Sequence, residues 1–323
     1  MKILNKCPLC KSNNIKYSLT GKDLLYKISD HEYPIFACDN CSAMFLNPFP
    51  SAEQTSQFYP KSYYSYETSH ADGFFEKVRK NIVEYHLNPK NKLSLIDKFF
   101  VFIFRSKFSG IPLYKKKGGK FLDIGCGIGS NLKLLNSYGW ETHGIEIDEN
   151  AVKHARKNGL NVTKNTIENV DFGINKFDCI RLWHVLEHLT NPISALNKIK
   201  LQLSPNGEIL IAVPNTNSFA KKLFRNYWYS LDTPRHVINY SSKTIQYLCQ
   251  KNQLKISKIQ YSSAASFLGG ISHLLRSHLN FEGNLVNNYF LLILLSPLDF
   301  ISDMLHQGDT IFVKITHEKK ETA

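Results

Sequence analysis

Apolar runs and amphipathic stretches alternate through the middle of the chain, between residues 120 and 213. A short apolar run bounded by glycine or charged residues predicts a buried strand, and apolar residues that recur every three or four positions predict a helix. The pattern predicts strands at 120–124, 141–147, 177–182 and 207–213, and helices at 130–137, 149–158 and 192–203. Strands that alternate with helices are typical of an α/β fold with a parallel, doubly wound sheet.

After Pro214 the pattern is less regular, although it still predicts a helix at 242–252 and strands at 254–261 and 309–316. Two further apolar stretches, at 95–117 and 289–304, have two interpretations. They are either core helices of a lid domain, which is the commoner case, or helices that lie on a membrane surface. No uninterrupted apolar run approaches the roughly 18 residues that a membrane-spanning helix requires.

The first 50 residues are rich in turn-forming residues and contain two Cys-x-x-Cys pairs. Cys7 and Cys10 are separated from Cys38 and Cys41 by 27 residues, and this layout lets two turns converge on one tetrahedral Zn²⁺. Four thiolates leave no coordination position open, so we expect a structural ion that stabilises a segment with little apolar burial of its own. Buried or redox-active cysteines are the alternative interpretation.

The sequence Asn-Pro-Phe-Pro at 47–50 predicts an extended exit from this segment. We therefore expect a zinc-binding module at 1–50, a helical connecting or lid region at 51–117 and an α/β domain at 118–323. The remaining cysteines are isolated from one another and are predicted to fill the core. They are Cys126, Cys179 and Cys249.

The predicted strand at 120–124 runs directly into a glycine-rich loop, GCGIG at 125–129. Closely spaced glycines after a strand let the backbone approach a ligand at the carboxyl edge of a parallel sheet. Asp123 precedes the glycines, and Glu146 follows Gly129 by 17 residues, at the end of the next predicted strand. An acid in that position accepts hydrogen bonds from ribose hydroxyls, so the pattern predicts a cofactor that contains a nucleoside.

The segment FLDIGCGIG, with an acid after the next strand, resembles the first motif of class I methyltransferases that use S-adenosylmethionine (SAM). The resemblance covers residues 121–213. It implies that Asp123 supports the loop and the amino-acid end of the cofactor, that Glu146 holds the ribose, and that residues 165–168 approach the adenine. The implied cofactor-binding residues are Asp123, Gly125, Cys126, Gly127, Gly129, Glu146, Ile147, Thr166, Ile167, Trp183 and His184. An NAD-binding domain is the alternative, but the third glycine of its GxGxxG pattern is not at the expected place.

The zinc module followed by this domain resembles the zinc-containing sugar methyltransferases of deoxysugar and surface-glycan pathways. The similarity includes CDNCSAMFLNPFP and the tyrosine-rich FYPKSYY. In that family the N-terminal module and its tyrosines help to shape the substrate pocket, which implies substrate contacts by Tyr59, Tyr63 or Tyr64. Ordinary packing of these tyrosines is equally compatible with the sequence.

Two histidines and a glutamate follow the predicted strand at 177–182, in the sequence WHVLEH. In a doubly wound fold this strand end opens onto the transferred methyl group. We therefore expect His188 to act as a general base, with Glu187 orienting it or binding substrate. His236 comes after a later predicted strand at the same sheet edge and is the second catalytic candidate. Its neighbour Arg235 is a candidate substrate contact.

A divalent metal is a competing interpretation of the same residues. His184, Glu187 and His188 have the i, i+3, i+4 spacing of one helical face, and His236 would complete a set of four ligands. A similar set binds a divalent ion in small-RNA 3′-terminal 2′-O-methyltransferases, although His184 stands where that family has a carboxylate. Base catalysis without a metal is the interpretation that the sequence favours, and purely structural histidines are the third.

The chain carries 40 Lys and Arg against 27 Asp and Glu, a formal charge of +13 that favours anionic partners such as nucleic acid, phospholipid headgroups or diphosphate-bearing substrates. We expect SAM-dependent methyl transfer to a small molecule, foremost a nucleotide- or lipid-linked sugar in glycan biosynthesis. Metal-assisted 2′-O-methylation of RNA is the alternative, which the scattered basic residues do not favour.

The N-terminus lacks a signal-peptide pattern, so we expect a cytoplasmic protein. We expect no obligate protein partner, and peripheral contact with the inner face of the membrane is a further option.

Overall fold

The computed structural model describes residues 1–59, 119–263, 265–279 and 285–318, together with the single residues 81, 94, 95, 97, 98, 281 and 283. Most of the expected connecting region at 51–117 therefore lies outside the described residues. The same holds for Tyr63, Tyr64 and most of the apolar stretch at 95–117.

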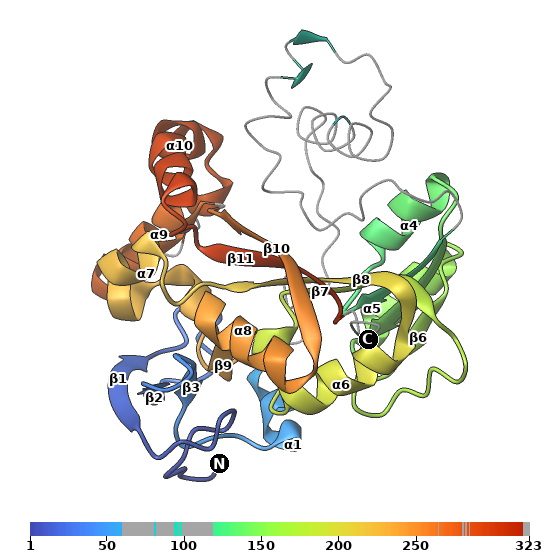
Figure 1. Ribbon diagram of the computed structural model, residues 1–323. Helices are drawn as coiled ribbons and strands as arrows, with labels where there is room; N and C mark the ends of the chain where they lie inside the picture. The colour runs from blue at the N-terminus through green and yellow to red at the C-terminus, as the bar shows by residue number, and fades with distance from the viewer. Residues whose placement is uncertain are drawn as a thin grey trace.

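A seven-stranded sheet with the order β10-β11-β8-β7-β4-β5-β6 forms the centre of the molecule (Figure 1). Its strands are β4 (Lys120–Ile124), β5 (Glu141–Glu146), β6 (Val162–Lys164), β7 (Phe177–Trp183), β8 (Leu203–Pro214), β10 (Leu254–Ser262) and β11 (Thr310–His317). The strands from β8 to β6 are parallel, whereas β11 is antiparallel to both β8 and β10. The Rossmann-like α/β fold is therefore confirmed. The parallel arrangement expected for the strands between 120 and 213 is present, and the two strands after Pro214, β10 and β11, add an antiparallel edge to it.

The helices fall into two groups. Those that alternate with the parallel strands are α4 (Ser130–Ser137), α5 (Glu149–Lys157) and α6 (Pro192–Gln202), and α8 (Ser242–Lys251) follows later and packs beside β10. A second group lies together beside the β10 and β11 end of the sheet (Figure 1): α7 (Phe219–Phe224), α9 (Ser266–Leu279) and α10 (Tyr289–Met304). The described residues contain no helix that is long and apolar enough to cross a membrane.

The sheet is buried on both faces, because alternate residues of the same strand enter different apolar clusters. Phe121 and Cys179 pack with α4 and α5, whereas Leu122 and Ile180 pack on the opposite face. Burial on both faces explains why these strands have nearly continuous apolar sequences, which made them predictable. Cys179 and Cys249 fill the core as expected, and Cys126 is half-buried.

The N-terminal residues form a second sheet with the order β1-β2-β3-β9. Its strands are β1 (Ile15–Gly21), β2 (Tyr33–Cys38), β3 (Met44–Leu46) and β9 (Ile238–Asn239), and the short helix α1 (Ala52–Thr55) and a 3₁₀ turn (Ser56–Phe58) follow it in the chain. β9 comes from the α/β part of the chain, and one continuous apolar cluster joins residues of both sheets. The first 50 residues therefore share their core with the rest of the protein.

Most observed bounds agree with the predicted ones to within two residues, but β8 begins at Leu203 and not at residue 207. The α5 helix begins where expected because the Asp148 side chain accepts a hydrogen bond from the Ala151 amide at its first turn. Short elements such as β6 and β9 had no predicted counterpart, and neither did α7 or α9.

Candidate active site at the carboxyl edge of the sheet

The glycine-rich loop after β4 has a backbone conformation that its glycines make possible. Gly125, Gly127 and Gly129 have φ angles of 70°, 54° and 83°, in the left-handed region that side chains disfavour. A Cβ atom at Gly125 would lie 2.6 Å from Cγ2 of Val185. The loop therefore exposes backbone without side chains at the sheet edge, as the sequence predicted. A side chain at Gly125 would fill the space beside the loop.

Glu146 at the end of β5 braces this loop. Its Oε2 accepts a hydrogen bond of 2.8 Å from the Gly127 amide, and its Oε1 accepts bonds from the amides of Ile147 and Asp148 at 2.8 and 3.0 Å. Each carboxylate oxygen has two acceptor positions. Oε2 therefore keeps one position for a ribose hydroxyl, so the residue fits the nucleoside that the sequence predicted.

Asp123 lies beneath the loop and pairs with Arg181 of β7, whose Nη1 donates to Oδ2 at 2.9 Å. Both side chains are buried, and burial raises the pKa of Asp123 to about 6. The second oxygen of Asp123, Oδ1, has no hydrogen-bond partner among the described residues. A buried acceptor of this kind suits the ammonium group of an amino acid. Arg181 was not predicted, although a basic residue between the apolar residues of the strand FDCIRLW was a signal for it.

The register of the parallel strands brings these positions together. Ile124 pairs with Ile145 and with Leu182, so the loop, Glu146 and Trp183 follow at one edge. The remaining predicted cofactor residues differ in their exposure. Ile147 is exposed, Cys126, Thr166, Trp183 and His184 are half-buried, and Ile167 packs in the apolar core. Ile167 therefore has only its backbone to offer a ligand.

Glu187 is the buried centre of the histidine cluster. Its side chain is 0% exposed, and its Oε1 accepts a hydrogen bond from Nδ1 of His184 at 3.0 Å and lies 3.9 Å from Nε2 of His236. Its Oε2 has no hydrogen-bond partner among the described residues. The sequence suggested that Glu187 orients His188, whereas the direct hydrogen bond goes to His184.

The helical face expected for His184, Glu187 and His188 is not present. Only Leu186–His188 forms a helical turn, of the 3₁₀ type, and His184 lies before it with a left-handed φ of 53°. The chain must turn sharply there to leave β7. This turn, and not helical periodicity, places the Glu187 carboxylate next to His184.

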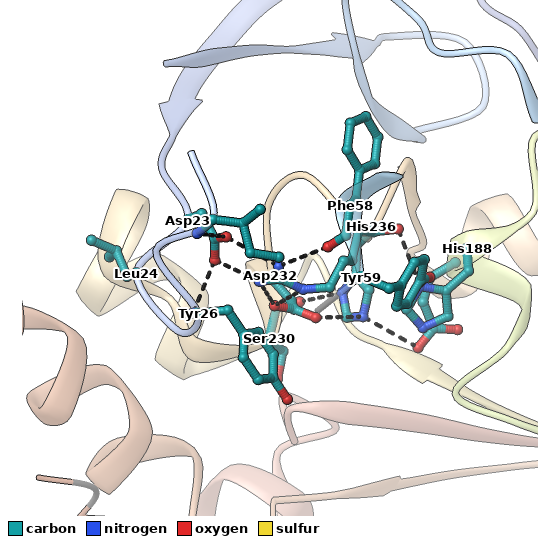
Figure 2. A network of polar contacts seen from close by, with 12 residues as sticks. Asp23, Leu24, Tyr26, Phe58, Tyr59, His188, Ser230, Asp232 and His236 are labelled. Carbon is teal, nitrogen blue, oxygen red and sulfur yellow. Dashed lines mark hydrogen bonds and ion pairs between the residues drawn. The ribbon is translucent and has the colours of Figure 1, made fainter. Parts of the chain in front are cut away.

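His188 and His236 face each other at the same place, with ring centroids 4.7 Å apart. Nδ1 of His188 lies 3.1 Å from the Arg235 carbonyl oxygen and 2.8 Å from the Tyr59 hydroxyl, and Nδ1 of His236 lies 2.9 Å from the Ser230 carbonyl oxygen (Figure 2). A carbonyl only accepts, so each Nδ1 carries a proton, and a neutral ring with this tautomer has its lone pair on Nε2. Burial lowers the pKa of His188 to about 4, which keeps this ring neutral at pH 7.

Arg235 has a position that the sequence did not suggest. Its buried guanidinium donates to Asp23 of the N-terminal segment at 2.7 Å and to Asp232 at 2.6 Å, and it also donates to the Phe58 carbonyl at 3.3 Å (Figure 2). Its side chain is 0% exposed. The side chain proposed for substrate binding is thus fully occupied in fastening the N-terminal segment to the loop that carries His236.

Glu187, His188 and His236 also have the arrangement of metal ligands, since one ligand atom of each lies within 4.8 Å of the others. Each of the two histidines has its Nδ1 proton bonded to a backbone carbonyl, which is the usual support for a metal-binding imidazole. His184 is not part of this group. The four-ligand set expected from the sequence is therefore reduced to three.

The four N-terminal cysteines converge as predicted. Sγ of Cys7 lies 3.6 Å from that of Cys41, and Sγ of Cys10 lies 3.5 Å from that of Cys38. Four sulfur atoms bound to Zn²⁺ at about 2.3 Å would be separated by about 3.8 Å. The cluster fits a structural zinc ion.

We expect the purified protein to contain one zinc ion per chain that depends on these cysteines. Cys38→Ser should lower the zinc content and reduce the unfolding free energy by several kcal/mol, because zinc binding is coupled to folding. Metal analysis and thermal unfolding would measure both effects. Cys249→Ala, in the core but away from the cluster, is the control. An unchanged zinc content in Cys38→Ser would contradict the assignment.

Part of this chain is similar to known proteins. Residues 100–259 match a family model described as a methyltransferase domain. A ubiquinone biosynthesis O-methyltransferase of Actinobacillus pleuropneumoniae is 35% identical over 111 residues, which cover 30% of this chain and 47% of the relative. A protein of the same name from Coxiella burnetii is 26% identical over 133 residues, which cover 39% of this chain and 54% of the relative. The chain thus spans about half the length of the curated relatives that it matches.

Two solved structures are similar to this chain. A SAM-dependent methyltransferase of Thermotoga maritima, described as a possible histamine N-methyltransferase, has a TM-score of 0.45 at 16% identity and covers 70% of this chain and 96% of its own. A SAM-dependent methyltransferase of Archaeoglobus fulgidus has a TM-score of 0.45 at 19% identity and covers 76% of this chain and 99% of its own.

Proposed function

We propose, from the match of residues 100–259 to a methyltransferase domain, that this chain transfers a methyl group from SAM to a hydroxyl oxygen of a small molecule. One observation carries the proposal. A bare glycine loop braced by Glu146 lies at the ends of β4 and β5, and unprotonated imidazole nitrogens lie beyond the end of the adjacent β7.

The residues at the loop have distinct tasks in this proposal. When bound, SAM supplies an electrophilic methyl group, so the protein has to align the acceptor and remove its proton. Glu146 would accept a hydrogen bond from the ribose, and Oδ1 of Asp123 would accept one from the ammonium group. The exposed Ile147 would pack against the adenine.

The proton of the acceptor hydroxyl goes to a histidine. Nε2 of His188 is our first candidate for the base and Nε2 of His236 the second, because hydrogen bonds to backbone carbonyls fix the Nδ1 protons of both rings. The Glu187 carboxylate accepts the Nδ1 proton of His184 in a similar way, so Nε2 of His184 is a third candidate. The Tyr59 hydroxyl would hold the ring of His188 in place.

A divalent ion held by Glu187, His188 and His236 is the competing proposal for the same residues. Two imidazole nitrogens and a buried carboxylate oxygen without a partner among the described residues are a suitable donor set. Such an ion would lower the pKa of a bound hydroxyl. The three side chains would then bind the ion, and they would not act as the base that takes the proton of the acceptor hydroxyl.

For the acceptor we propose a nucleotide- or lipid-linked sugar, on the basis of the resemblance in the zinc module. The named role of the curated relatives favours a second candidate, an acceptor of ubiquinone biosynthesis. RNA is a third candidate, for which the formal charge of +13 is the support. A cytoplasmic location remains a prediction.

Gly125→Ala should weaken SAM binding while the protein still folds. The new methyl group would collide with Val185 and oppose the left-handed backbone, so we expect at least a roughly 10-fold loss of affinity. Gly139→Ala is the matched control, since Gly139 has a φ of 83° but nothing within 4 Å of the added atom. Calorimetry with S-adenosylhomocysteine measures the affinity of both variants.

Label transfer from SAM to sugar nucleotides, quinol precursors and short RNAs would then identify the acceptor class. Transfer to an oxygen of one class supports the proposal. Absence of SAM binding by the wild-type protein, or tight binding of NAD in its place, would overturn it.

A further inference from the structure

In an ordinary surface helix the apolar residues are buried and the polar residues are exposed. The α10 helix has the reverse arrangement. Six apolar residues on one stripe are between 44% and 75% exposed: Phe290, Ile293, Leu294, Leu298, Ile301 and Met304. Polar residues face inward, since Asp299 is 7% exposed and bonds to Ser266 of α9, and Ser302 is 5% exposed. A helix that buries a carboxylate and exposes leucine and isoleucine is suited to an apolar environment outside the protein.

The segment just after α10 is hydrogen-bonded to α7. Gln307, just after α10, accepts a hydrogen bond from the Phe219 amide through its carbonyl and one from Nζ of Lys222 through its side chain. Phe219 and Leu223 of α7 are themselves 45% and 57% exposed. We call the exposed residues of α7 and α10 the apolar face, and it lies at the β10 and β11 end of the sheet (Figure 1).

Three cations border the apolar face on α7 and just after it. Lys222 and Arg225 are exposed, and Lys221 is half-buried beside them. The only carboxylates in the sequences of α7 and α10 are those of Asp299 and Asp303, and neither is exposed. Positive charge therefore borders an apolar surface without exposed negative charge from these two helices, which is complementary to anionic headgroups above an acyl layer.

We propose that the apolar face binds the surface of a lipid bilayer that contains anionic lipid. The exposed stripe of α10 enters the boundary between headgroups and acyl chains, and Lys222 and Arg225 contact the headgroup phosphates. A second copy of this chain suits the face less well. A twofold interface would place the same cations of both copies together without exposed acids of α7 or α10 to pair them.

Co-sedimentation with vesicles tests the proposal independently of methyl transfer. The wild-type protein should sediment with phosphatidylglycerol vesicles and remain in solution with phosphatidylcholine vesicles. Ile293→Asp should weaken the binding to phosphatidylglycerol at least roughly 10-fold, because it places a charge within the stripe. Ile174→Asp is the matched control, since Ile174 is 96% exposed in a loop far along the chain from either helix.

Charge reversal tests the second part of the surface. Lys222→Glu combined with Arg225→Glu should also weaken binding roughly 10-fold, whereas Lys133→Glu on the exposed side of α4 should leave it unchanged. Circular dichroism of each variant establishes that it is folded. Wild-type protein that stays in solution with phosphatidylglycerol vesicles would overturn the proposal. A wild-type dimer in light scattering that Ile293→Asp converts to a monomer would also overturn it, in favour of a second copy.

Discussion

Glu187→Gln is expected to lower kcat by roughly 100-fold or more while leaving the affinity for SAM unchanged. The carboxylate is fully buried, bonds to His184 and lies near His236, so its charge fixes the protons of the ring nitrogens around it. The amide has nearly the same shape but offers an N–H group where a proton acceptor is needed. Steady-state kinetics with the acceptor identified by label transfer would measure the change.

Glu141→Gln is the control for this variant, because Glu141 is an exposed acid of the same sheet whose partners are His143 and Lys120. Its kcat should equal that of the wild type. If Glu187→Gln also retained full kcat, Glu187 would have no part in the reaction.

The same variant separates a base from a metal site without reference to activity. If an ion is held by Glu187, His188 and His236, the wild-type protein contains a second ion in addition to zinc, and Glu187→Gln loses it. If the histidines act as bases alone, both proteins contain the same metal. Elemental analysis after gel filtration measures the difference.

Arg235→Met should destabilise the protein by about 3–5 kcal/mol, because it leaves the carboxylates of Asp23 and Asp232 without their buried counter-ion. Methionine retains much of the volume of the side chain, so lost charge and not a cavity would account for most of the effect. Urea unfolding followed by circular dichroism would measure the free energy.

Arg225→Met provides the comparison for this substitution, since Arg225 precedes the same loop but is exposed. Its unfolding free energy should change by less than about 0.5 kcal/mol. Adding Asp23→Asn to Arg235→Met should recover part of the lost stability, because it removes one of the two unpaired charges. Equal stability of Arg235→Met and the wild type would show that the buried ion pairs contribute nothing.

Local patterns in the sequence determined the α/β part of the fold and the cofactor loop. Strands such as β4 and β7 are buried on both faces, so most of their residues are apolar and their bounds are visible without a structure. The glycines at 125–129 come directly after one of these strands and Glu146 ends the next, and the cysteine spacing defines the four-cysteine cluster in the same way. In each case the functional residues are fixed by their distance along the chain.

Tertiary structure alone decided how the histidine cluster is assembled and supported. Tyr59 and Asp23 approach His188 and Arg235 from the N-terminal part of the chain, and no periodicity in the sequence marks these contacts. The pairing of β9 with β3 that unites the two sheets involves only two residues of β9. Local propensity acts over a few residues, whereas these contacts depend on the packing of segments up to 212 positions apart, so only the folded chain specifies them.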